Sequence, residues 1–139
     1  MKNVFFGIAT IMMVAFSCAG QTVAPQAVSK AFAAKFSKAK DVKWGKENAH
    51  EYEAEFTEGT VKASANFNDK GEWLETEMVI DVSAVPQTVK DAFEKLYPGV
   101  TIIAADKIEK STGTIHYEIE YKSGTKTHEA IFDENGKQV

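Results

Sequence analysis

The sequence predicts an α+β fold, in which two copies of one unit, each a helix followed by antiparallel strands, share a sheet that helices cover on one face. Three observations predict this fold. A segment that begins at Pro25 recurs about sixty residues later, apolar residues follow a helical period at the start of each copy, and polar and apolar residues alternate in the strands that follow. The 139 residues are enough chain for one domain.

The composition excludes several classes of protein. The chain carries a formal net charge of −4, and all 16 of its basic residues are lysines. Proteins that bind nucleic acid favour a basic balance and the planar guanidinium of arginine, and this chain has neither. With 9 glycines, 3 prolines and 11% aromatic residues, it is also unlike a disordered or fibrous chain.

The first residues have the layout of a secretory signal peptide. Lys2 is followed by the uncharged, mostly apolar run 4–16, which is too short to span a bilayer, and then by the small residues 17–20. We expect a signal peptide over residues 1–19 and an exported, periplasmic protein.

Two processing routes remain open for this signal peptide. One is a type I site at Ser17-Cys18-Ala19; the other is a lipoprotein site resembling a lipobox at 15–18, with Cys18 lipidated and anchoring the protein to the envelope.

The repeat is the most informative feature of the sequence. The matching segments are Pro25–Phe32 with Pro86–Phe93, Tyr52–Phe56 with Tyr117–Tyr121, and Phe67–Gly71 with Phe132–Gly136. Several matches in the same order at a nearly constant offset indicate a duplication. We therefore expect a first repeat over residues 20–82 and a second over 83–139, which together form one domain.

Each repeat is expected to begin with an amphipathic helix. Pro25 and Pro86 suit the first helical turn, and the apolar residues that follow them fall on one helical face. Those apolar residues are Val28, Ala31, Phe32 and Phe36 in the first helix, and Val89, Phe93, Leu96 and Tyr97 in the second. Pro98-Gly99 ends the second helix, and a strand then follows at about 41–45 and 101–108.

A hairpin follows in each repeat. Two-residue loops at 58–59 and 123–124 give the pairing, which in the first hairpin sets Phe56 opposite Val61. One face of each hairpin is then apolar and packs under the helix, and the other carries glutamates, as expected for a sheet covered on one side only.

The turn 68–71 leads into a further strand and is expected to set Phe67 beside Glu72. The helix-facing residues of this strand are then Leu74, Thr76 and Met78, and the outward-facing residues are Trp73, Glu75 and Glu77. In the second repeat Gln138 takes the place of Trp73, so the chain ends as the equivalent strand begins.

These segments together resemble a known family. The pattern consists of the proline-led helix, then 41–44 (DVKW), 52–56 (YEAEF) and 67–74 (FNDKGEWL). It resembles the PepSY-like, beta-lactamase-inhibitor-like family of exported bacterial proteins over essentially the whole chain after the signal peptide. The resemblance implies tandem α-β-β-β-β units that form one curved antiparallel sheet, with helices on the convex side and an open concave face. The better-known relatives bind and inhibit enzymes through such a face, PepSY modules accompany secreted peptidases, and no catalytic residue comes with the family.

The sequence contains no recognisable catalytic equipment. It has no Gly-x-Ser-x-Gly elbow, no glycine-rich phosphate loop and no His-Glu-x-x-His pair, and its only cysteine, Cys18, lies at the processing site. We expect a non-enzymatic binding module without a cofactor, with inhibition of an enzyme or peptidase as one form of it, that engages a protein or peptide through the uncovered sheet face. The expected face consists of Trp73, Glu51, Glu53, Glu55, Glu75, Glu77, Glu118 and Glu120.

The two tryptophans have different interpretations. On an uncovered face ringed by glutamates, Trp73 would anchor a partner; the alternative is burial against the other repeat, the linker 81–85 or another subunit. Trp44 is expected in the core under the first helix. The glutamates themselves are expected to be solvated, since nothing in the sequence predicts burial that would perturb their pKa values.

The alternative function is an envelope protein that binds a ligand or metal ion. His116 is expected on the outward side near Glu118 and Glu129, an arrangement that could hold a divalent ion. The competing interpretation is a solvated histidine, because metal sites need a converging third ligand. His128, set opposite Ile119 and facing inward, is interpreted as a core or rim histidine rather than a catalytic base.

Overall fold

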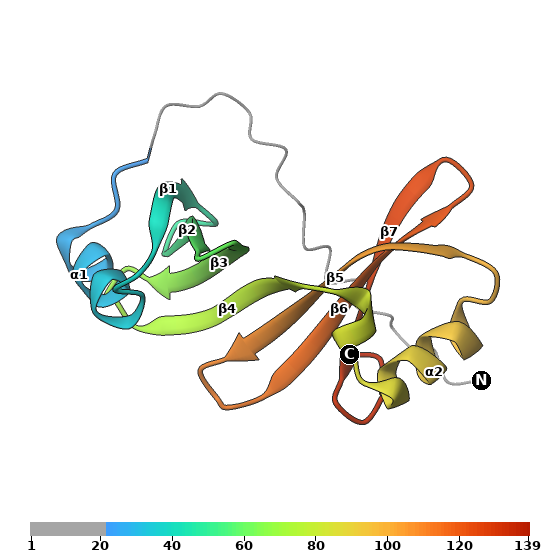
Figure 1. Ribbon diagram of the computed structural model, residues 1–139. Helices are drawn as coiled ribbons and strands as arrows, with labels where there is room; N and C mark the ends of the chain where they lie inside the picture. The colour runs from blue at the N-terminus through green and yellow to red at the C-terminus, as the bar shows by residue number, and fades with distance from the viewer. Residues whose placement is uncertain (1–21) are drawn as a thin grey trace.

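The computed structural model describes residues 22–139, and the expected signal peptide and Cys18 lie outside the described residues (Figure 1). The elements in chain order are α1 Gln26–Lys35, β1 Lys40–Lys46, β2 Glu51–Glu58, β3 Val61–Asn68, β4 Trp73–Ile80, the 3₁₀ turn η1 Val82–Ala84, α2 Gln87–Leu96, β5 Thr101–Lys110, β6 Ile115–Ser123 and β7 Lys126–Asp133. We call α1 to β4 the first half and α2 to β7 the second half.

The strands form one antiparallel sheet in the order of the chain, from β1 to β7. The ladder between β4 and β5 joins the two halves, and the helices lie far apart, α1 beside the first half and α2 beside the second (Figure 1). In the paired strands Ala65 is opposite Thr76, and Ile80, four residues further along β4, is opposite Ala105. All four residues are therefore on one face, which both helices cover. The α+β fold predicted from the sequence is confirmed.

Each helix packs on its own hydrophobic core. Phe32 of α1 packs edge-on against Phe56, with the ring centroids 5.1 Å apart, and Phe93 of α2 packs in the same way against Tyr121 at 5.2 Å. The core of the first half consists of Val28, Phe32, Ala54, Phe56, Ala65 and Phe67. That of the second half consists of Val85, Val89, Phe93, Ala105, Ile119, Tyr121, Ala130 and Phe132. The duplication predicted from the sequence therefore corresponds to two cores built in the same way.

Pro25 and Pro86 lie immediately before α1 and α2, at the N-cap rather than inside the first turn as expected. Their backbone is extended, with ψ of 151° and 143°. A proline has no N–H to leave unpaired, so it lets the chain enter a helix from an extended segment without loss of a hydrogen bond.

The hairpin loops are Gly59-Thr60 and Gly124-Thr125, one residue further along the chain than expected. Each glycine has a positive φ, 64° and 63°, at the first loop position, where a primed hairpin turn requires it. The pairing is therefore shifted by two residues, so that Phe56 lies opposite Ala63 rather than Val61. Because side chains alternate with a period of two, this shift leaves every residue on its expected face.

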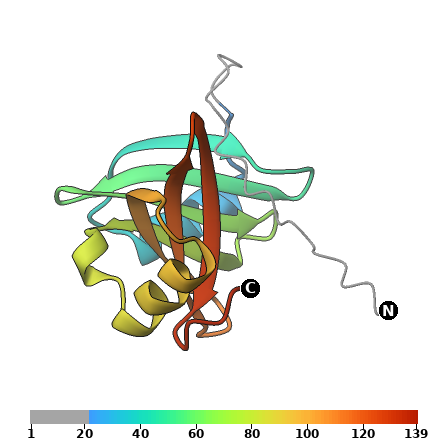
Figure 2. The same ribbon diagram turned by 90° about the vertical axis from the view of Figure 1, so that its right-hand side faces the viewer.

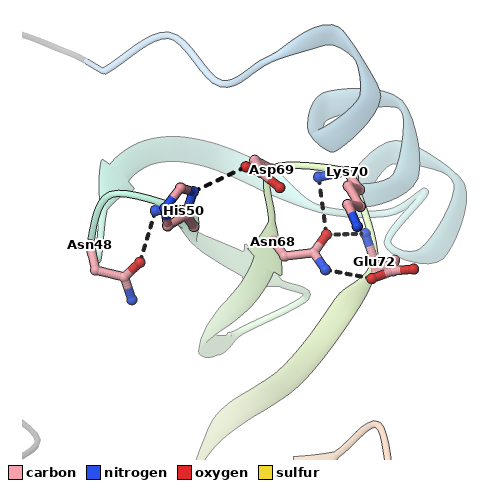
Figure 3. Close-up of polar contacts among 6 residues, drawn as sticks. All are labelled: Asn48, His50, Asn68, Asp69, Lys70 and Glu72. Carbon is pink, nitrogen blue, oxygen red and sulfur yellow. Dashed lines mark hydrogen bonds and ion pairs between the residues drawn. The ribbon is translucent and has the colours of Figure 1, made fainter.

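The turn between β3 and β4 differs from the expected one and changes the position of Trp73. The side-chain Oδ1 of Asn68 accepts hydrogen bonds from the N–H groups of Lys70 and Glu72, both at 3.0 Å, and its Nδ2 donates to the Glu72 carboxylate at 2.5 Å (Figure 3). This closed turn is followed by a bulge in which Phe67 pairs with Trp73 and the pairing passes over Leu74. Trp73 therefore shares the helix-covered face with Phe67, and its expected outward placement is wrong.

The second half has an equivalent turn after β7, at residues 133–137. Asp133 Oδ1 accepts from the N–H groups of Asn135 and Lys137, both at 2.9 Å, and Phe132 forms a single bridge with Gln138. Gln138 thus occupies the position of Trp73, and the last strand is present only as its first bridge, as the sequence predicts.

Candidate binding face

The sheet face away from the helices carries a cluster of acidic residues. Cross-strand pairing sets Glu55 and Glu77 on either side of Ser64. The other acids of this face are Glu53, Glu75, Asp106, Glu118, Glu120 and Glu129. We call these acids together the acidic face. The remaining expected glutamate, Glu51, lies at its margin, where its carboxylate accepts a hydrogen bond from Asn48 at 2.7 Å.

This face is strongly curved. In Figure 2 the strands of the first half run across the view, whereas β7 runs up it, so the sheet twists sharply between its two edges. No helix within residues 22–139 covers this side, yet Ile108 is 2% exposed and Glu118 7% exposed. Residues in the middle of a flat uncovered face would be exposed. Their burial shows that the sheet and its side chains enclose the centre of the acidic face.

Burial changes the protonation of the central acids. The pKa of Glu118 is raised to about 8, first by burial and then by the nearby charge of Glu129. The pKa of Glu77 is raised to about 7, again by burial and then by Glu75. Burial also raises the pKa values of Glu53, Asp106 and Glu129. The expectation of fully solvated glutamates is therefore wrong at the centre of the face, where carboxyl groups keep their protons near neutral pH.

Within the described residues, few basic groups or hydrogen-bond donors contact the carboxyl groups of these acids. Lys110 Nζ lies 2.8 Å from Glu75 Oε2, which is the ion pair that the structure describes on this face. The Oε2 atom of Glu118 and the Oδ1 atom of Asn66 are buried and have no hydrogen-bond partner among residues 22–139. Buried polar atoms are normally paired, so Glu118 and Asn66 are exceptions on this face.

A hollow of about 620 Å³ opens beside these acids. Acids and lysines line it together with the apolar side chain of Val79. The charged residues that line it are Asp41, Lys43, Glu53, Glu55, Lys62, Glu77 and Asp106. A hollow of this size accommodates several side chains of a protein partner.

Neither tryptophan contributes to the acidic face. Trp73 is half-buried against the core of the first half, with Lys35 Nζ 3.6 Å from its ring centroid and its Nε1 donating to Thr76 Oγ1 at 2.9 Å. Trp44 packs against Phe32 with the ring centroids 5.3 Å apart, as expected for a core residue. The partner anchor expected at Trp73 is therefore not available on this face.

The histidines lie at separate places. His116 is on the acidic face, opposite Ile108, and His128 is exposed at the rim, stacked on Tyr121 at 5.5 Å rather than opposite Ile119. His50 lies beside Asp69 at the tip of the first half, 3.2 Å from its carboxylate (Figure 3). Within residues 22–139, no group of three or more His, Cys, Asp or Glu residues is arranged to hold a metal ion. His116, Glu118 and Glu129 therefore do not form a metal site in this structure.

Asp106 and Ile108 are important members of this face that sequence reasoning missed. Strand β5 carries apolar residues on both faces, and a bulge between Ile102 and Ala104 breaks its alternation. The sequence of β5 carries no signal that marks them. The ladder between β4 and β5 in the structure sets Ile108 opposite Glu77 and so assigns the alternate residues of β5 to the acidic face.

None of the helices in the described part of the chain has the length and apolar character needed to cross a membrane.

Solved structures with the same fold include a DUF2874 family protein from Bacteroides ovatus (19% identity, TM-score 0.74, covering 85% of this chain and 86% of that one). A protein from Bacteroides eggerthii described as a putative periplasmic protein is similar at 16% identity and a TM-score of 0.77, with 85% and 87% of the chains covered. A BLIP-like protein from Bacteroides fragilis is similar at 20% identity and a TM-score of 0.70, with 86% of each chain covered.

No functionally curated protein matches the sequence. The sequence model of one family matches residues 14–60 and again residues 50–138, so the two matches together span most of the chain. The first match runs through α1, β1 and β2, and the second runs from β2 through β7. That family is described as "Putative beta-lactamase-inhibitor-like, PepSY-like". The duplicated helix-and-strand unit, the single antiparallel sheet and this double match agree, and the chain belongs to the PepSY-like, beta-lactamase-inhibitor-like family.

Proposed function

We propose that this protein is an exported, non-enzymatic binding module that engages a protein or peptide through its acidic face. The observation that carries the proposal is a curved sheet face, hollowed and lined by acids, that neither helix of the described part of the chain covers. The family description supports one form of this binding, inhibition of an enzyme or peptidase.

The charge of the face suits a basic partner. Acidic side chains gather on this face within a chain whose net charge is −4. Complementary charge mainly accelerates encounter and excludes wrong partners, and its effect falls with salt. We therefore expect binding of the natural partner to weaken as ionic strength rises.

Export belongs to the same proposal. The signal peptide over residues 1–19 delivers the protein to the periplasm, with the envelope as the anchored location if Cys18 is lipidated. The repeats over 20–82 and 83–139 then act as one domain. The mass of the mature N-terminal peptide distinguishes a lipidated Cys18 from a chain cut at a type I site.

Site-specific photo-crosslinking in the envelope of the source cell tests the proposed face. A photoreactive phenylalanine analogue is introduced at Lys62, which is exposed and lines the hollow, and in a control variant at Ala33, which is exposed on α1. We expect a discrete crosslinked protein or peptide from position 62 and none from position 33. Equal crosslinking from both positions, or crosslinking from position 33 alone, would contradict the proposal.

A further inference from the structure

The Glu118 carboxyl is buried on the acidic face without a complete set of partners. The residue is 7% exposed, and its Oε2 atom has no hydrogen-bond partner within the described residues. A buried carboxyl without a partner is costly, because it loses its hydration and gains nothing in return. Such a group is therefore expected to have a partner in the functional state.

The groups around Glu118 are themselves mostly acidic. Asp106 of β5 lies directly opposite it, and Ile131 is its neighbour on β7. Further acids come from each adjoining strand. The charged and titratable groups facing it are Glu75 and Glu77 on β4, Asp106 and Lys110 on β5, His116 and Glu120 on β6, and Glu129 and Asp133 on β7. Lys110 is paired with Glu75, so no free cation of this set serves Glu118.

We propose that Glu118, Asp106 and Glu77 form a socket for the side-chain cation of a lysine or arginine that a protein or peptide partner presents. This inference rests on the proposed binding function and specifies the chemistry of its partner. Asp106 and Glu77 line the hollow, and Glu118 is the cross-strand neighbour of Asp106 on β6. A long basic side chain entering through the hollow would lay its aliphatic stem along Val79 and bring its charged end to the carboxyl groups.

An organic cation fits this site better than a metal ion. The described residues contain no group of three ligands placed for a metal ion, whereas a guanidinium has five donors that can reach carboxylates on different strands. The chain has no arginine of its own to supply such a group. A guanidinium at this site would therefore come from the partner.

Binding in this socket would release protons. Near neutral pH the free protein holds protons on Glu118 and Glu77, whose pKa values are about 8 and about 7. An adjacent cation favours the ionised carboxylates, so their pKa values fall and the protons pass to the buffer. A cation held elsewhere on the acidic face, farther from these two carboxyl groups, would release fewer protons.

Calorimetric titration of the protein with a hexa-arginine peptide tests the socket, with the uncharged hexa-citrulline peptide as the matched ligand. Measurement at pH 7 in two buffers of different ionisation enthalpy gives the number of protons released. We expect the arginine peptide to bind at least about tenfold more tightly than the citrulline peptide. We also expect release of about one proton per peptide bound.

Glu118→Gln is the diagnostic variant, because glutamine has the shape of the protonated carboxyl and keeps the fold. We expect it to lose at least about tenfold in affinity and most of the proton release. Asp106→Asn is a second socket variant at the hollow itself. The matched control is Glu109→Gln, which removes the same charge from an exposed residue on the other face and should change affinity by less than about twofold.

Three outcomes would overturn the inference: similar affinity for the two peptides, no proton release, or equal losses in Glu118→Gln and Glu109→Gln. The proposed function has a separate outcome. If the partner crosslinked at position 62 binds Glu118→Gln as tightly as the unaltered protein, the proposed binding face is supported and the proposed socket is contradicted. Absence of crosslinks at position 62 would contradict both the proposed binding face and the socket.

Discussion

Glu118→Gln should make the protein more stable at alkaline pH. A carboxyl whose pKa is higher in the folded protein than in the unfolded chain keeps its proton longer in the folded state, so stability falls as the pH rises between the two values. For Glu118 these values are about 8 and 4.5. Raising the pH from about 5.5 to about 8.5 should therefore cost the folded state about 3 kcal/mol through this one group. Glutamine does not titrate, so the variant should not show that loss.

Urea unfolding at the two pH values measures the effect. The unaltered protein should lose stability between pH 5.5 and pH 8.5, and Glu118→Gln should lose at most half as much, because Glu77 and the other raised acids still titrate. Glu109→Gln, with the same change in charge at an exposed position, should follow the unaltered protein. An identical loss in Glu118→Gln and in the unaltered protein would refute the assignment of Glu118 as the buried, protonated group.

Three further predictions concern the fold. Gly136→Ala should lower the free energy of unfolding by at least about 2 kcal/mol, because φ is 78° and the new Cβ would lie 2.6 Å from the carbonyl oxygen of Thr88. Asn68→Ala should cost about 1–2 kcal/mol through the lost turn hydrogen bonds. Trp73→Ala should cost about 3 kcal/mol through lost core packing while leaving the affinity for the arginine peptide within about twofold. Thermal and urea unfolding measure all three.

Each of these predictions has its control. Gly113→Ala has a similar φ of 82° with nothing within 4 Å of the new Cβ, so a loss as large as that of Gly136→Ala would show that contact with α2 is unimportant. Asn68→Asp keeps the accepting oxygen and should recover most of the stability; no recovery would point to another cause. If Trp73→Ala weakened peptide binding tenfold at unchanged stability, its placement in the core would be wrong.

The helices and hairpins of this fold could be predicted from the sequence, because a small error in the position of a loop need not move the strand residues to the wrong face. The hairpin loops were expected one residue too early, yet Phe56 and the glutamates of β2 stayed on their faces since the pairing moved by two residues. The position of Trp73 could not be predicted in this way. It depends on the hydrogen bonds of the Asn68 side chain, which change the length of a turn and introduce a bulge.

Most glutamates of the acidic face could be assigned to it from the sequence, but their burial and raised pKa values could not. Glu118 and Glu120 follow the alternation of β6, which the sequence displays directly. The burial of Glu118 depends on how far the sheet curves and on which residues of β5 lie beside it. Both are tertiary properties that involve the β4–β5 ladder and the bulge at Ile103, and periodicity within one strand carries no information on them.

The ladder between β4 and β5 determines where this group of acids can form. Glu77 belongs to the first half, whereas Asp106 and Glu118 belong to the second, so the three acids meet only across this ladder. Each half has its own helix, hairpin and hydrophobic core, but neither half alone contains the three acids. The junction between two similar halves is therefore an asymmetric environment, which a single helix-and-strand unit does not provide.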